Sequence, residues 1–123
     1  MVAPNVKSPA AIYLKSIDPV LLSVVGTPTS ILANPASSGK VLKLNALRFS
    51  NGDDADVNYK GGLLLKKSGG SAELIGFHVV AARSAQLMVA RNEVIYLEEN
   101  DELLGYGSTA SKLYAFGSYE EIS

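Results

Sequence analysis

The stretch "KVLKLNALRFSNG", residues 40–52, decides the fold class of this chain. Its side chains alternate between the two sides of an extended chain, so that Val41, Lys43 and Asn45 share one face. The alternation fails near Arg48, which predicts a β-bulge there. A long strand with one regular face therefore lies near the middle of the sequence.

Similar runs of Val, Ile, Leu, Tyr and Phe continue to both ends, separated every 8 to 15 residues by clusters of Gly, Pro, Ser, Asn and Asp. Such punctuation is typical of a β-sandwich or β-barrel. We expect an all-β protein: a single-domain antiparallel β-sandwich of the jelly-roll type, with about eight strands, over residues 11–123. Residues 1–10, with two prolines and no strong pattern, are expected to form an extended arm. The apolar runs are Ala11–Lys15, Val20–Val25, Thr29–Leu32, Lys40–Ser50, Ala55–Lys66, Ala72–Val80, Gln86–Ala90, Val94–Leu97, Glu102–Gly107 and Lys112–Ile122.

The connections between these runs have recognisable turn chemistry. Asn51-Gly52 is the dipeptide that accepts the positive φ of a tight reversal. "KKSGGSAE", residues 66–73, predicts a hairpin loop, and "NPASSGK", residues 34–40, predicts a surface loop. "AARSAQLMVAR", residues 81–91, contains good helix formers, but its apolar stripe is poor, so a turn at Arg83-Ser84 followed by a strand is the favoured interpretation.

The composition excludes several function classes. Eleven Lys and Arg against twelve Asp and Glu give a net charge of −1, which argues against a nucleic-acid partner. The absence of cysteine excludes disulfides, thiolate zinc sites and cysteine nucleophiles. The most apolar run, Val20–Val25, is far shorter than the roughly 20 residues of a membrane-spanning helix, and the first residues lack the pattern of a signal peptide. We therefore expect neither a membrane partner nor export.

Four carboxylates crowd into five positions at Glu98, Glu99, Asp101 and Glu102, between two apolar runs. A catalytic acid pair needs a cleft that separates the two pKa values, and a calcium loop needs a glycine at its sharp bend. Neither requirement is met by "EENDE". We interpret the segment as a solvated turn between two strands, with contact to a partner or weak cation binding as the alternatives.

No other motif predicts catalytic, cofactor-binding or metal-ligating residues. The calcium-like spacing of Asp54, Asp56 and Asn58 lacks its glycine and its final glutamate. "SSGK", residues 37–40, lacks the first glycine and the Ser or Thr of a phosphate-binding loop. His78 is the single histidine, too few for a metal enzyme of this fold class, and is expected to be a packed or edge residue. We expect no enzyme and no cofactor.

Three segments together resemble a known group of proteins: "AIYLKSIDPVLLSVVGTPTSILANPASSGKVLKLNALRFSNGDDADVNYK" (11–60), "VARNEVIYLEENDELLGYGS" (89–108) and "KLYAFGSYEEIS" (112–123). The chain resembles small all-β virion proteins of tailed bacteriophages, of the head-decoration, collar or tail-attachment kind. The resemblance covers residues 11 to 123 and departs at Asn100, where a glycine is common. It implies a structural role, location in the virion after assembly in the host cytoplasm, and no catalytic residues.

The resemblance leaves the station in the virion open. A capsid decoration protein, commonly a trimer, is favoured because a compact domain with a short arm suffices for that role. A neck, collar or tail-fibre adaptor with six- or twelve-fold symmetry is the alternative. A carbohydrate-binding β-sandwich module is a second alternative, weakened by the lack of tryptophan, and a small sandwich enzyme is the weakest.

The expected partners are other copies of the chain and other virion proteins, such as capsid or neck and tail proteins. Near-zero net charge and a mean hydropathy of +0.16 leave apolar surface for such contacts. The candidate interface residues come from the arm, the acidic turn and the last strand: Val2, Val6, Glu98, Glu99, Tyr114, Phe116 and Tyr119.

Overall fold

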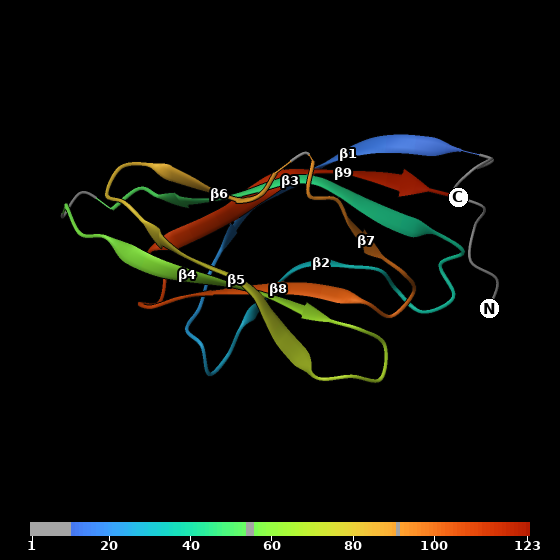
Figure 1. Ribbon diagram of the computed structural model, residues 1–123, viewed down its shortest axis with the longest axis horizontal. Coiled ribbons are helices and arrows are strands. Elements are labelled where there is room, and N and C mark those ends of the chain that lie inside the picture. Colours follow the sequence, from blue (N-terminus) through green and yellow to red (C-terminus); the bar gives the residue numbers. More distant parts are fainter. Residues whose placement is uncertain (1–10, 54–55, 91) are drawn as a thin grey trace.

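The computed structural model describes residues 11–53, 56–90 and 92–123. Within these ranges the chain contains nine β-strands and no helix, arranged as two antiparallel sheets that pack face to face (Figure 1). The prediction of an all-β antiparallel sandwich is confirmed. The described ranges hold nine strands where about eight were expected, and the ten apolar runs give nine because the first two, Ala11–Lys15 and Val20–Val25, contribute to one strand, Ile12–Leu21.

One sheet has five strands and the other has four. The five-stranded sheet has the order β1-β9-β3-β6, with β7 also paired to β3. Its strands are β1 (Ile12–Leu21), β3 (Val41–Asn51), β6 (Ala85–Val89), β7 (Ile95–Leu97) and β9 (Leu113–Ile122). The four-stranded sheet, in the order β2-β8-β4-β5, consists of β2 (Thr29–Ala33), β8 (Glu102–Gly107), β4 (Tyr59–Lys66) and β5 (Ala72–Val80).

The chain passes repeatedly from one sheet to the other: β1, β3, β6, β7 and β9 lie in one layer, and β2, β4, β5 and β8 in the other. Because strands that are distant in sequence pair within each sheet, most contacts in the molecule are long-range. The finer jelly-roll assignment stays a prediction, which this strand order favours.

The core lies between the sheets, and β3 contributes most to it. The buried leucine and phenylalanine side chains of β3 are Leu42, Leu44, Leu47 and Phe49. Leu44 and Leu47 are three residues apart, so a regular strand would place them on opposite faces. The extra residue Asn45 forms a bulge opposite β9 and returns the following side chains to the core. The predicted position of the bulge, near Arg48, is therefore wrong: the register from Leu47 to Phe49 with β9 is regular, and the irregularity beside Arg48 in the pairing with β6 comes from the extra residue Met88 on β6.

The turns agree with the sequence in two places and differ in a third. Gly69, with a φ of 74°, turns the β4–β5 hairpin, and Arg83, with a φ of 57°, precedes β6, as expected. The tight reversal predicted at Asn51-Gly52 is wrong. Asn51 is buried, and its side-chain amide donates to the carbonyls of Val57 (2.7 Å) and Val80 (3.1 Å), so it fastens a longer loop.

Candidate functional site

The acidic turn lies at the end of the sandwich where the β2–β3, β4–β5 and β7–β8 connections meet, on the right in Figure 1. Asp101 is only 2% exposed. Its carboxylate accepts hydrogen bonds from the backbone N–H groups of Glu98 (2.9 Å) and Ser68 (2.9 Å) and from the ammonium of Lys67. Asp101 therefore fastens the β4–β5 hairpin to the acidic turn.

Glu99 and Asn34 extend this network. Glu99, 4% exposed, accepts the N–H of Gly39 through Oε1 (2.9 Å), whereas its Oε2 has no hydrogen-bond partner among the described residues. The amide of Asn34 donates to the carbonyls of Lys40 (2.8 Å) and Leu97 (3.0 Å). The prediction of a fully solvated acidic turn is therefore wrong for Glu99 and Asp101. Their carboxylates accept hydrogen bonds from backbone N–H groups of neighbouring loops in place of water.

Asn100, at the departure from the virion-protein pattern, has a φ of 68°. Asparagine tolerates this left-handed conformation better than most residues, and glycine adopts it freely. The turn thus keeps the place expected for it, and the backbone explains why a glycine would fit at this position.

The Asp101 carboxylate is expected to make the folded protein less stable in acid. Burial raises the pKa of its carboxyl, but the hydrogen bonds from Lys67, Glu98 and Ser68 outweigh burial and hold the pKa below its ordinary value of about 4. The resulting stabilisation is complete above that ordinary value and is lost as the pH falls through the lower folded-state pKa. We expect Asp101→Asn to lose about 1–3 kcal/mol of unfolding free energy at pH 7.

The measurement is urea unfolding of both proteins at pH 7 and at pH 3. The gap between wild type and Asp101→Asn should narrow at pH 3, which lies below the ordinary pKa of an aspartate, because the carboxyl of the unfolded chain is then mostly protonated. Glu98→Gln, at an exposed acid of the same turn, serves as the control and should change stability by less than about 0.5 kcal/mol. An equal gap at both pH values would show that Asp101 acts through its shape and not its charge.

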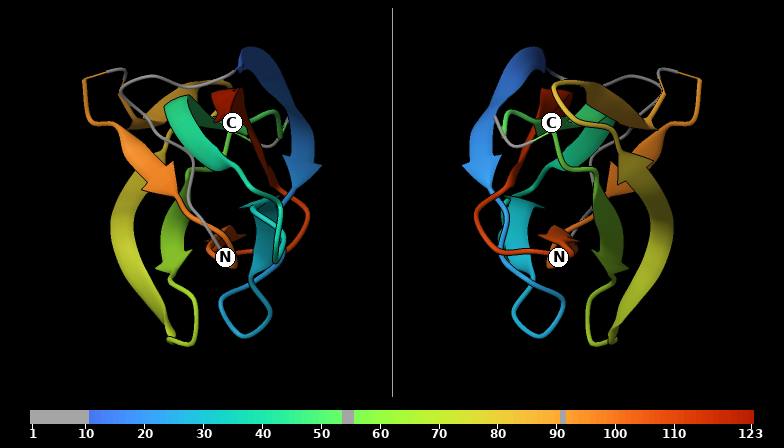
Figure 2. Two further views of the ribbon diagram at one scale, coloured as in Figure 1. Left: turned by 90° about the vertical axis from the view of Figure 1, so that its right-hand side faces the viewer. Right: turned by 90° about the vertical axis from the view of Figure 1, so that its left-hand side faces the viewer.

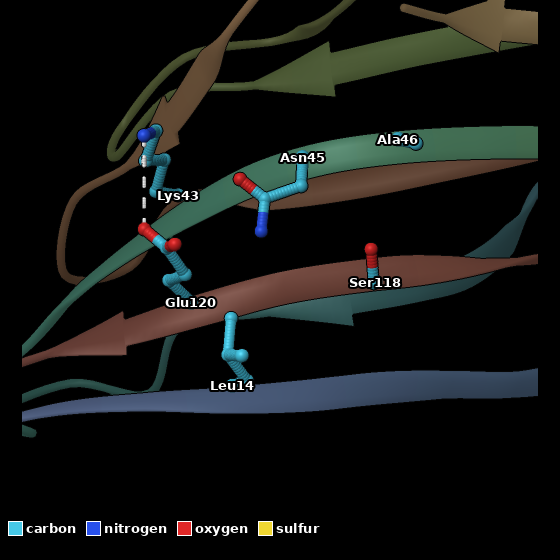
Figure 3. Close-up of a pocket in the computed structure, with 6 residues that line it drawn as sticks. All are labelled: Leu14, Lys43, Asn45, Ala46, Ser118 and Glu120. Atoms are coloured by element: carbon cyan, nitrogen blue, oxygen red, sulfur yellow. Dashed lines mark ion pairs between the residues drawn. The ribbon is translucent and has the colours of Figure 1, made fainter. Parts of the chain in front are cut away.

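The outer face of the five-stranded sheet carries a shallow groove of about 400 Å³. Lys43 and Asn45 of β3 line it together with Ser118 and Glu120 of β9, and Leu14 of β1 forms one wall (Figure 3). The ammonium of Lys43 lies 3.6 Å from the carboxylate of Glu120. Hydrogen-bonding side chains beside an exposed apolar wall could hold a polar ligand.

The four-stranded sheet has an outer face of a different kind. Cross-strand partners share a face, so the register places two rows there: Leu104–Leu64–Leu74 and Tyr106–Gly62–Phe77. Val79 extends the surface along β5. The outer face of a sheet in contact with water is normally polar, so an apolar outer face of this extent is unusual. We call it the apolar face and define it by Leu64, Leu74, Phe77, Val79, Leu104 and Tyr106.

β5 is also the margin of this sheet (Figure 2). Within the described ranges no strand pairs with its free side, and most of its residues are exposed. Leu74 is 53% and Phe77 49% exposed. Proteins usually protect long edge strands with charges, prolines or covering loops. His78 is exposed on this strand, so the expectation of an edge residue is confirmed.

The predicted interface residues do not form one patch. Tyr114 and Phe116 share the outer face of β9, whereas Tyr119 points inward and packs against the core. Glu98 is exposed at the end of the sandwich, but Glu99 is buried and offers no carboxylate to a partner. Val2 and Val6 lie outside the described residues.

Sequence reasoning missed the apolar face and the free edge of β5. The available signal was "ELIGFHVV", residues 73–80, where apolar residues follow each other without alternation. That pattern fits a strand buried on both sides as well as an exposed one, so sequence alone did not separate the two.

Among the described residues no group of three or more His, Cys, Asp and Glu side chains is placed to hold a metal ion, and no helix is long and apolar enough to cross a membrane. The remaining chemical features are the groove, the apolar face and the acidic network. They provide binding surfaces of polar and apolar character.

Comparison with known proteins gives the fold alone. No protein-family profile matches the chain, and no curated protein matches it. A solved structure of Bacillus endospore appendages, described as disulfide-linked pili, is similar over 100% of this chain and 97% of that one, with a TM-score of 0.52 and 11% identity. This chain has no cysteine with which to form such links.

A second solved structure is more distant. It contains the CBM22-1 and GH10 modules of a Clostridium thermocellum endo-1,4-β-D-xylanase complexed with xylohexaose. The similarity covers 90% of this chain and 25% of that one, with a TM-score of 0.33 and 11% identity.

Proposed function

We propose that this protein is a structural virion protein of a tailed bacteriophage, a capsid decoration protein that assembles with copies of itself and with capsid subunits. The observation that supports a structural subunit most directly is the exposed β5 edge beside the apolar face. Association is favourable when a partner covers apolar surface and pairs with free backbone groups. The resemblance to virion proteins supports the finer assignment to a phage particle.

The likeness to the endospore appendage is consistent with a structural role, since that protein forms pili and shares the fold. Because this chain lacks cysteine, contacts between its copies would form without disulfides. Such contacts depend on buried apolar area and on complementary hydrogen bonding, so they weaken on dilution.

Self-assembly is tested by measuring the mass of the purified protein by light scattering after size-exclusion chromatography, across a dilution series. We expect a mass that is a multiple of 12.9 kDa at the highest concentrations and falls on dilution. A mass that stays at 12.9 kDa at every concentration would overturn self-assembly.

The same experiment separates the two virion stations. A trimer, alone or paired into a hexamer, supports decoration of a capsid. A six-fold ring without a trimeric form, or a twelve-fold ring, supports the alternative of a neck, collar or tail-fibre adaptor. Negative-stain images of the purified oligomer distinguish two stacked trimers from a ring.

The groove on the five-stranded sheet favours a second candidate, a carbohydrate-binding module. Asn45, Ser118 and the Lys43–Glu120 pair offer donors and acceptors, and Tyr96, directly opposite Lys43 on β7, is exposed beside them. Sugars are held by hydrogen bonds together with flat apolar contacts of this type. Binding of soluble oligosaccharides on a glycan array, by a protein that stays monomeric, would favour this candidate.

A further inference from the structure

We propose that two copies of this chain pair through β5, antiparallel and related by a two-fold axis between Ile75 and Gly76. The two four-stranded sheets would then form one continuous sheet, with Glu73 of each copy opposite His78 of the other. The occupant of the β5 edge is thus a second copy of the same strand. This inference deepens the proposed function and rests on it.

The register of β5 provides the first reason. Leu74 and Phe77 lie on the outer face, opposite Leu64 and Gly62, although they are three residues apart. The register shift at Ile75 causes this odd spacing. In a partner strand without a bulge, alternate residues share one face of the sheet. The side-chain faces of such a strand would agree with those of β5 on one side of the β5 bulge but not on the other. A reversed copy of β5 has the same odd spacing at the matching place and keeps every face aligned.

Side-chain chemistry provides the second reason. In the proposed register each pair of residue numbers adds to 151, so Glu73 meets His78 of the other copy and Leu74 meets Phe77. Glu73 and His78 both lie on the face opposite to that of Leu74 and Phe77, and both are exposed in the single chain. A carboxylate opposite an imidazole gains a charge-assisted hydrogen bond.

The apolar face provides the third reason. The row Leu104–Leu64–Leu74 would continue across the two-fold axis into Phe77, Gly62 and Tyr106 of the other copy. The apolar face of one copy thus meets that of the other without a polar break. Joining them covers the exposed flanks of Leu74 and Phe77, which are among the most exposed large apolar side chains of this sheet.

The other sheet edges are poorer partners for β5. β2 and β6 are only five residues long. β1 is long, but its own register shift lies at Asp18 and Pro19, and a proline supplies no N–H to a new ladder. The exposed apolar part of β1, from Ile12 to Leu14, has the regular alternation that the bulged β5 edge does not match.

The test is charge exchange at the Glu73–His78 contact, read as mass by light scattering across a dilution series of the full chain. Glu73→Lys places a lysine opposite His78, and His78→Glu places two carboxylates opposite each other. Each variant alters both symmetric contacts, so we expect each to pair only at about tenfold higher concentration than wild type. At the concentration where half of the wild-type chains are paired, most chains of each variant should be unpaired, so the mean mass of the variant should be lower than that of wild type.

Mixing the two single variants gives the decisive result. In a mixed pair, the lysine introduced by Glu73→Lys in one copy faces the carboxylate introduced by His78→Glu in the other. The second contact of that pair keeps the original Glu73 and His78. We expect the mixture to recover pairing to within about twofold of wild type. Asp18→Lys, at an exposed position on the edge strand β1, makes the same charge change as Glu73→Lys and should leave the mass unchanged.

The outcomes separate this inference from the proposed function. Recovery by mixing, with an inert Asp18→Lys, supports pairing through β5. A wild type that forms oligomers insensitive to both exchanges, or that is dissociated by Asp18→Lys instead, overturns the β5 contact and leaves self-assembly intact. A wild type that is monomeric at every concentration overturns both. Far-ultraviolet circular dichroism of each single variant confirms that the sheets have formed.

Discussion

Phe49→Ala is expected to cost about 3–5 kcal/mol of unfolding free energy, the largest loss of any substitution proposed for this protein. Phe49 is fully buried on β3, and its ring lies against the backbone of Gly61 on β4 and Gly105 on β8. A methyl group placed on Gly61 would come within 2.6 Å of the ring, and one on Gly105 within 3.0 Å. The two glycines thus form a slot for this side chain between the sheets.

The loss is large because the slot cannot close. Glycine has no side chain that could move into the vacated space, so most of the ring's volume would remain as a cavity. Equilibrium unfolding in urea measures the effect. Phe116→Ala, which removes the same atoms from a partly buried position on the outer face of β9, is the control and should cost much less. Equal losses for the two variants would mean that the sheets close over the cavity.

Gly117→Ala is expected to lose about 3 kcal/mol, at the upper end of what overpacking usually costs. Gly117 lies on β9 opposite Leu47, next to the bulge at Asn45. A Cβ atom built on Gly117 would lie 2.1 Å from the carbonyl oxygen of Ala46. Because that oxygen belongs to the backbone of a central strand, the clash is relieved only by displacing β3 from β9.

The clash expected for Gly117→Ala arises from the bulge in β3. The group that approaches Gly117 is the bulged backbone of β3. The melting temperature and urea midpoint of Gly117→Ala measure the effect. Gly52→Ala is the matched control, because nothing lies within 4 Å of a Cβ at that glycine, and its stability should change by less than about 0.5 kcal/mol. Similar behaviour of the two variants would contradict the clash.

The site was predicted less well than the fold, and single residues show why. The crowding of acids at residues 98–102 was visible in the sequence, but the burial of Glu99 and Asp101 depends on backbone N–H groups of Gly39 and Ser68, which lie about 30 to 60 residues away. The exposure of Phe77 depends on β5 being the last strand of its sheet. Neither depends on neighbours in the sequence, so no local pattern could reveal it.

The sequence by itself determined the fold class, the approximate strand boundaries and the presence of a bulge in the strand of residues 41–51, but not its position at Asn45. These properties follow from local rules: alternation with a period of two, glycine and asparagine at turns, and the limits that composition sets on function. The strand after Arg83 was predicted correctly because a poor apolar stripe outweighed helix propensity over a few residues.

Only the tertiary structure decided which strands are edges, which acids are buried and which apolar side chains stay in contact with water. The physical reason is that burial is a property of pairing between distant segments. An apolar strand such as β5 has the same local pattern at the centre of a sheet as at its margin, and only the strand order leaves its free side open to a partner.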